Sequence, residues 1–101
     1  MAQLVIVYWR DIPAQVIVRR GRVTAKRELA PRFQEAIDSA AMRGGARETD
    51  AYLADWRRAD PVEVGDELEA EAAAAAARLE AEFDDARLTN LVADGGRDGA
   101  G

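Results

Sequence analysis

The chain has 101 residues and contains neither cysteine nor histidine. This length fits one small domain. The two missing residue types exclude disulfides, thiol nucleophiles, imidazole bases and Cys/His metal sites within the sequence. Because 22 of its apolar residues are alanine, few large side chains are available for a core. The formal net charge is −5, with +4 over residues 1–45 and −9 over residues 46–101. This asymmetry predicts attraction between the two halves or toward a charged partner.

The apolar start of the chain does not have the pattern of an export signal or a membrane span. Leu4–Trp9 has no basic region before it and no small-residue cleavage site after it. It is also far shorter than the ~20 residues that cross a bilayer. We therefore expect a cytoplasmic protein without a membrane partner.

The first thirty residues predict an antiparallel sheet. Leu4–Trp9 is a β-branched and aromatic run that predicts a first strand. Arg10–Pro13 predicts a turn or a kink, since its proline cannot donate to a ladder. Ala14–Arg20 predicts a second strand, and Gly21–Arg22 marks the reversal of a hairpin. Val23–Leu29 alternates as a third strand does, although part of it also has good helix propensity.

Two helices are expected next. The first begins at Pro31, which suits a first helical turn, and ends at Gly44–Gly45. Its apolar stripe consists of Phe33, Ile37, Ala40 and Ala41. Thr49 is the expected cap of a shorter second helix that stops at Asp60–Pro61. Tyr52, Leu53 and Trp56 share one face of this second helix.

A third and longest helix is expected near the C-terminus. Asp66 and Glu69 resemble a capping box at its start. Its apolar stripe consists of Leu68, Ala72, Ala75, Leu79 and Phe83. Leu88, Leu91 and Val92 either extend it or form one more turn after a break near Asp84–Asp85. The Gly-rich residues 95–101 predict a disordered tail, which leaves one domain over residues 1–94.

The run Ala72–Ala77 within this helix has two interpretations. Alanine is the strongest helix former, so the run serves to keep a marginal helix formed. Alternatively, its smooth surface lets another helix approach closely and makes a docking face.

A compact corner between the first two strands is the candidate partner-binding site. It consists of Trp9, Arg10, Asp11, Ile12 and Pro13. Tryptophan and arginine dominate the energetics of interfaces, so an exposed corner of this composition suits recognition. In the structural alternative, Trp9 closes the core and Arg10 pairs with Asp11 or with an acid of the third helix.

A basic patch on the predicted hairpin is a second candidate. It consists of Arg19, Arg20, Arg22, Lys26 and Arg27. A basic β-ribbon can lie against a phosphate backbone, which makes weak nucleic-acid binding an alternative function. The acidic total charge and the lack of a Gly-flanked aromatic motif oppose this alternative.

Acidic residues are concentrated in the third helix and just after it. They are Asp66, Glu67, Glu69, Glu71, Glu80, Glu82, Asp84 and Asp85. Their spacing does not form a calcium loop and is typical of a solvated helix face, so no metal site is predicted. No phosphate-cradling glycine motif and no G-x-S-x-G motif is present. We therefore predict that the chain alone is not an enzyme and needs no cofactor.

Four segments resemble the small bacterial virulence factor domain, a family related to a segment of conserved virulence factor C. The segments are Tyr8–Val16, Ala25–Leu29, Ala36–Ala41 and Glu48–Leu53. The resemblance spans roughly residues 4–70 and carries no catalytic motif, so it implies no active-site residue. The family's association with folate and corrinoid methyl-transfer genes implies one alternative, an accessory subunit of a one-carbon enzyme.

The expected fold is α+β, with a two- or three-stranded N-terminal antiparallel sheet packed by three helices, the last long and Ala-rich. The expected function is a non-enzymatic protein-interaction or accessory module. Its contacts are expected at the Trp9–Pro13 corner, an open sheet edge or the Ala-rich helix.

Overall fold

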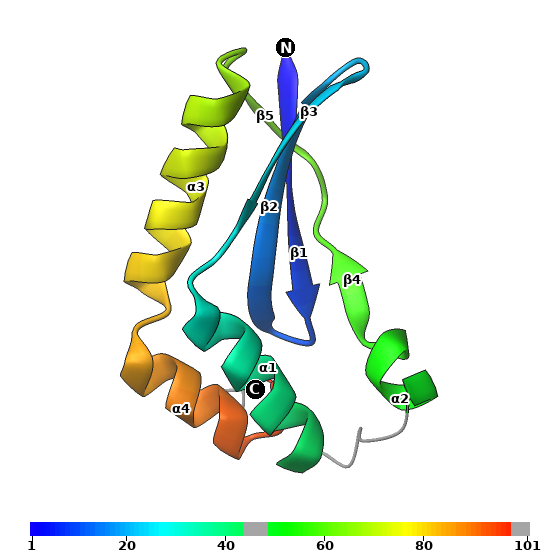
Figure 1. Cartoon of the computed structure of the whole chain (residues 1–101), viewed down its shortest axis with the longest axis vertical. Helices are drawn as coiled ribbons and strands as arrows, with labels where there is room; N and C mark the ends of the chain where they lie inside the picture. The colour runs from blue at the N-terminus through cyan, green and yellow to red at the C-terminus, as the bar shows by residue number, and fades with distance from the viewer. Residues whose placement is uncertain (44–48, 98–101) are drawn as a thin grey trace.

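The computed structural model describes residues 1–43 and 49–97 of the chain. Within them lie five strands and four helices (Figure 1), which confirms the α+β class. The elements are β1 (Ala2–Trp9), β2 (Ile12–Arg20), β3 (Val23–Glu28), α1 (Pro31–Arg43), α2 (Thr49–Ala54), β4 (Trp56–Arg58), β5 (Val62–Val64), α3 (Leu68–Glu82) and α4 (Asp85–Ala93). Gly44–Gly45, the expected end of the first helix, lies outside the described residues.

The sheet is antiparallel throughout, and β1 is its central strand. Its order is β3-β2-β1-β4, and β5 also pairs with β1. The turn expected at Arg10–Pro13 is shorter, because Ile12 and Pro13 already belong to β2 and pair with β1. The predicted β2–β3 hairpin is present, and Gly21 supplies the positive φ of 60° at its reversal. On the far edge of β1, β4 pairs with Val7–Trp9 and β5 pairs with Ala2–Leu4. β1 therefore has partners along both of its edges.

The strands β4 and β5 correct the expectation of a second helix that continues to Asp60–Pro61. The helix ends at Ala54, and Trp56 already belongs to a strand. The Arg10 backbone N–H donates to the Asp55 carbonyl at 3.0 Å, and the Ala59 N–H donates to the Ile6 carbonyl at 2.9 Å. These bonds satisfy backbone groups on the outer edge of β1, which a continued helix would leave unpaired. The sheet consequently has five strands instead of two or three.

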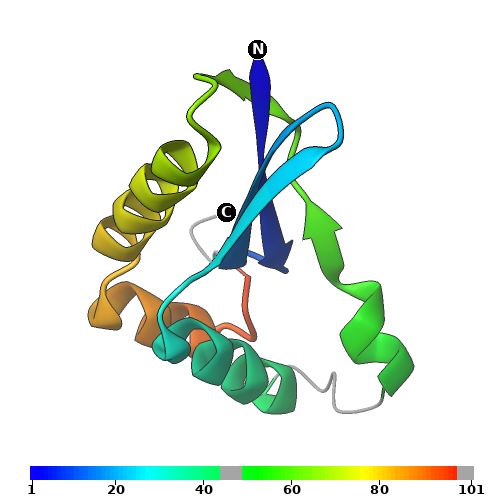
Figure 2. The same cartoon turned by 45° about the horizontal axis from the view of Figure 1, so that its top comes forward.

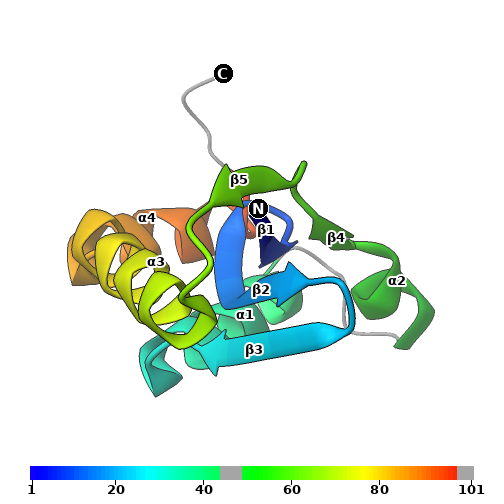
Figure 3. The same ribbon diagram turned by 90° about the horizontal axis from the view of Figure 1, so that it is seen from above.

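One face of the sheet is covered by α3. The strands β2 and β3 contribute Val16, Val18 and Ala25 to a buried cluster. The helix α3 contributes Ala72 and Ala75 to the same cluster. The alanine side chains let the helix axis lie close to the strands. Figure 3 shows α3 and α4 on one side of the strands and α2 on the other. The Ala-rich face therefore docks on the protein's own sheet.

The start of α3 differs from the predicted capping box. The helix begins at Leu68, and Glu67 occupies the cap position without a side-chain hydrogen bond. Asp66 instead lies 3.7 Å from the N-terminal ammonium and 3.9 Å from the Arg20 guanidinium. The carboxylate thus joins the start of β1 to the end of β2.

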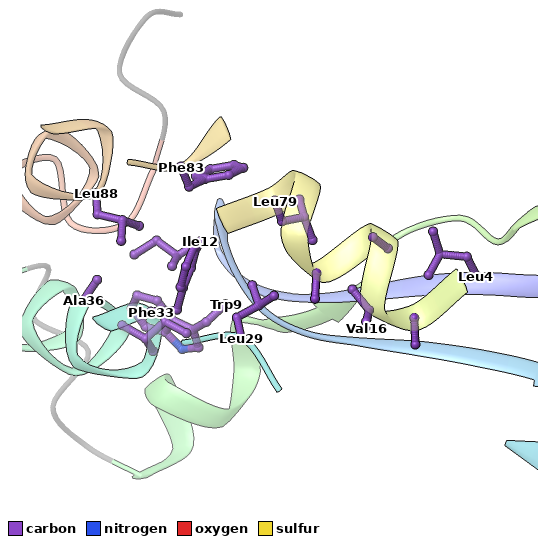
Figure 4. Packing of buried hydrophobic residues seen from close by; sticks show 14 of the residues in the cluster. Leu4, Trp9, Ile12, Val16, Leu29, Phe33, Ala36, Leu79, Phe83 and Leu88 are labelled. Atoms are coloured by element: carbon purple, nitrogen blue, oxygen red, sulfur yellow. The ribbon is translucent and has the colours of Figure 1, made fainter. Parts of the chain in front are cut away.

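The large core side chains gather at one end of the sheet, where α1 and α4 lie side by side (Figure 2). Trp9, Ile12 and Phe33 are each at most 1% exposed. Figure 4 shows Phe83 and Leu88 converging on the same cluster from the α3–α4 junction. The break expected near Asp84–Asp85 is present, because the Asp84 side chain accepts a hydrogen bond from the backbone N–H of Arg87 and caps α4.

The segment after α4 packs against the β1–β2 turn, although a disordered tail is expected from residue 95 onward. Gly95 and Gly96 are buried. The Gly96 carbonyl accepts from the Asp11 N–H at 2.8 Å, and the Gly95 carbonyl accepts from Arg10 Nη1 at 2.6 Å. A Cβ built on Gly96 would lie 2.8 Å from Cζ3 of Trp9. The packed chain therefore extends at least to Arg97, and residues 98–101 lie outside the described residues.

We expect Gly96→Ala to destabilise the domain by about 3 kcal/mol, because it combines a left-handed backbone with overpacking against Trp9. Gly21→Ala is the matched control, since Gly21 also has positive φ but a Cβ there meets nothing within 4 Å. Its expected cost is about 1 kcal/mol. Thermal unfolding should separate the two variants by roughly 10 °C. Equal melting temperatures would show that Gly96 does not pack on Trp9.

Candidate functional site

The corner proposed for partner binding is largely buried. Trp9 and Ile12 are fully inaccessible, and Pro13 is less than 2% exposed. The indole Nε1 of Trp9 donates to the Tyr52 carbonyl at 2.8 Å. Trp9 therefore closes the core, as the structural alternative predicts, and three of the five corner residues offer no surface to a partner in this conformation.

Arg10 and Asp11 are half-buried and join distant segments. Arg10 has a positive φ of 54°, and its Nε lies 2.9 Å from Oδ2 of Asp55. Its guanidinium also lies 4.6 Å from the centroid of the Trp9 ring. The partner of Arg10 is thus the acid that follows α2, not Asp11 or an acid of α3. Asp11 is paired with Arg57, whose Nη2 lies 3.3 Å from its Oδ1. The corner is a junction between β1, β4 and the C-terminal segment.

The basic patch is exposed but divided between the two faces of the hairpin. Register places Arg19 and Lys26 on the face opposite α3, while Arg20 and Arg27 lie on the α3 side and Arg22 lies in the turn. Arg20 pairs with Asp66, and the other four cations form no ion pair with a described residue. The five cations are all exposed on the hairpin, but they do not form one continuous basic surface.

The acidic residues of α3 take part in the fold. The Glu71 carboxylate accepts from the Gly65 N–H at 2.7 Å, and the Glu80 carboxylate accepts from the Ala30 N–H at 3.2 Å. Both interactions connect the helix to neighbouring loops. Within residues 1–43 and 49–97, no three carboxylates come together in a way that would hold a metal ion.

The structure reveals a groove on the sheet face opposite α3, which we call the Trp56 groove. It consists of two adjoining hollows of about 590 and 480 Å³, both lined by Gln15 and Trp56. The first hollow is also lined by Ala14, Glu28, Leu29, Pro31, Gln34 and Glu35. The second is also lined by Val7, Arg57 and Arg58. The groove thus runs from the start of α1, past the end of β3, to β4.

A chain of aromatic rings fixes the wall of the Trp56 groove to the core. The Trp56 ring packs edge-on against Tyr52, with centroids 5.9 Å apart, and Tyr52 stacks on Trp9 at 5.8 Å. The Tyr52 hydroxyl accepts from Nε2 of Gln34 at 3.3 Å, which links the same ring to α1. Trp56 is half-buried, so it presents an indole surface that is held in place before any partner binds.

The charges along the Trp56 groove differ between its two ends. Glu28 and Glu35 are exposed at the α1 end, and Arg58 is exposed at the β4 end. None of the three forms an ion pair with a described residue. Their charges are therefore available to a ligand, and the surface between them is mainly apolar, with Gln15 as a polar group.

Sequence reasoning missed this groove because it assigned Trp56 to the face of a helix. A helical Trp56 could not be recognised as the register partner of Trp9 on the adjacent strand β1. The sequence predicts the Pro31 start of α1, but only the folded chain brings that helix beside Trp56 of β4. Two short segments rich in β-forming residues, Trp56–Arg58 and Val62–Val64, are the sequence pattern that indicates short edge strands.

The comparisons with known proteins identify a family. The family model described as virulence factor matches residues 7–92. The chain belongs to this family. Neither the curated proteins nor the solved structures contain a match. The match confirms the resemblance found in the sequence and includes every residue that lines the Trp56 groove of this virulence factor domain.

Among the described residues of the virulence factor domain, no helix combines the length and the hydropathy that a bilayer crossing requires.

The two tryptophans of the virulence factor domain should respond differently to truncation. We expect Trp9→Ala to cost about 4 kcal/mol, because it empties a fully buried site and leaves the Tyr52 carbonyl without its donor. Trp56→Ala should cost about 1 kcal/mol, since its ring is partly solvated. Urea unfolding followed by circular dichroism measures both. A Trp56→Ala variant as unstable as Trp9→Ala would assign Trp56 to the core.

Proposed function

We propose that this domain is a cytoplasmic, non-enzymatic interaction module that binds an extended segment of a partner protein in the Trp56 groove. The segment carries an apolar side chain that packs on Trp56. Lysine or arginine on one side of that residue faces Glu28 and Glu35, and an acidic residue on the other side faces Arg58. The observation that carries this proposal is the half-buried indole, held by Tyr52, between charges of opposite sign.

The shape and composition of the groove support a binding role. Its volume lies within the range of ligand sites, and its floor mixes apolar surface with a few polar groups. A tryptophan at the centre of such a surface is the residue type most often found at interface hot spots. Because Tyr52 and Gln34 already hold the wall, binding has little conformational entropy to overcome.

The non-enzymatic part of the proposal rests on residue chemistry. The chain lacks histidine and cysteine, so nucleophilic or general-base catalysis would have to use carboxylates, tyrosine or arginine. The carboxylates of the groove, Glu28 and Glu35, are exposed to solvent. Their position on the surface of the groove favours a role in electrostatic recognition.

The geometry favours a protein partner over nucleic acid. A phosphate backbone needs several cations on one continuous surface. The hairpin instead divides Arg19 and Lys26 from Arg20 and Arg27 across the two faces of the sheet. Glu28 lies on the same face as Lys26 and would repel a polyanion.

Selection of random displayed peptides on the purified protein tests the proposal. We expect an enriched pattern of an aromatic or aliphatic residue with a basic residue on one side. Trp56→Ala should weaken the selected peptides by about tenfold or more, since it removes the apolar anchor. Glu35→Gln should weaken them severalfold, and the loss should shrink at high salt. Isothermal titration with a synthetic copy of a selected peptide measures each affinity.

Two matched variants serve as controls. Leu53→Ala removes an exposed apolar side chain that does not line the groove. Glu67→Gln removes an exposed carboxylate at the start of α3. Both should bind selected peptides as the parent protein does. Peptides that bind Trp56→Ala with parental affinity, or a selection without enrichment, would overturn the proposal.

A further inference from the structure

A separate hollow, on the α3 side of the sheet, is lined by arginine and aromatic side chains. It has a volume of about 340 Å³ and lies between β1, β4 and the α3–α4 junction. Its lining includes Tyr8, Asp11, Arg57, Phe83, Arg87 and Leu91. We call it the Arg57–Arg87 cleft. Its volume is at the lower limit of ligand pockets, so it suits a small molecule or a single side chain.

Both arginines of the cleft lie against aromatic rings. The Arg57 guanidinium carbon is 4.6 Å from the centroid of the Tyr8 ring, and that of Arg87 is 3.9 Å from the centroid of Phe83. Nε of Arg57 also donates to the Arg10 carbonyl at 3.0 Å. The N–H groups lie in the plane of each guanidinium, and those that no protein group accepts are open to an anion. Both donors are therefore positioned before a ligand arrives.

The cleft has hydrogen-bonding capacity that the described residues do not use. Arg87 forms no ion pair with a described residue, and its one side-chain hydrogen bond is a long one of 3.4 Å to the Glu82 carbonyl. The Tyr8 hydroxyl makes no hydrogen bond within the described part of the chain. Asp11 offsets one of the two positive charges through its contact with Arg57. A net positive charge and at least two free donors are left.

We propose that the Arg57–Arg87 cleft binds a phosphate monoester. Two guanidinium groups on different walls match a tetrahedral dianion, whose oxygens point in several directions and accept from both at once. A single carboxylate is planar and saturates one guanidinium. The Tyr8 hydroxyl supplies a third donor. The phosphate belongs either to a free small metabolite or to a phosphorylated side chain, since both present the same group to the cleft.

This inference is independent of the Trp56 groove. The cleft lies on the opposite face of the sheet and shares only Arg57 with the groove. The variants at Trp56 and Glu35 change the groove alone, and the variant at Arg87 changes the cleft alone. Failure of either site therefore leaves the other unaffected.

Titration with inorganic phosphate and with O-phosphoserine, followed by NMR of the arginine Nε–H signals, tests the cleft. We expect a saturable shift of the Arg57 signal, which the bond to the Arg10 carbonyl should keep observable. Arg87→Gln should weaken phosphate binding by about tenfold, because it removes one charged donor. Arg78→Gln is the matched control, with the same loss of charge at an exposed position of α3 outside the cleft. It should bind as the parent protein does.

Further titrations identify whether the phosphate belongs to a small metabolite or to a protein. They also test whether ionic strength alone causes the NMR shift. A phosphoserine peptide that binds more tightly than free O-phosphoserine assigns the site to a phosphorylated protein, and the reverse order assigns it to a small metabolite. Sodium acetate and sodium chloride at matched ionic strength should give no saturable shift. The proposal would be overturned by any of three results. These are an Arg57 shift with acetate equal to that with phosphate, an Arg87→Gln variant with unchanged affinity for phosphate, or a shift that does not saturate.

Discussion

The contact between Trp9 and Gly96 holds together parts of the chain that the sequence places far apart. The indole at the end of β1 occupies the space that a Cβ on Gly96 would fill. Its Nε1 binds the Tyr52 carbonyl, and its face stacks on the Tyr52 ring. One side chain thereby joins the central strand, α2 and the C-terminal segment. The Trp56 groove depends on this arrangement because Tyr52 is the ring on which Trp56 packs.

The distribution of side-chain size explains why both candidate sites lie toward the same end of the molecule. The large buried residues Trp9, Ile12, Phe33 and Ile37 cluster where α1 and α4 close the sheet. Farther along the strands, α3 contributes mainly alanine, which gives close packing but little apolar area. Rigid, preorganised walls are therefore available near Trp9 and scarce at the hairpin tip, where Val23 is 63% exposed.

Patterns that depend on neighbouring residues in the chain were predictable, and contacts across the fold were not. The β2–β3 hairpin follows from a glycine with positive φ between β-branched runs, and α3 follows from helix propensity. The strands β4 and β5 have three residues each and form because the outer edge of β1 needs partners. Composition alone assigned Gly95 and Gly96 to a flexible tail, because it cannot show that only glycine fits beside Trp9. The groove and the cleft were missed for the same reason, since both require β4.

The charge asymmetry between the two halves of the sequence is used partly within the molecule. Of the six ion pairs in the described residues, four join a cation of the first half to an acid of the second half. Most are exposed and contribute little to stability, whereas the Arg10–Asp55 pair is largely shielded from solvent. The total charge therefore does not by itself require a charged partner. In the two proposed sites, charges without a described ion-pair partner lie beside fixed aromatic rings: Glu28 and Glu35 near Trp56, and Arg87 on Phe83. These positions are where a ligand gains electrostatic energy without first breaking an ion pair of the fold.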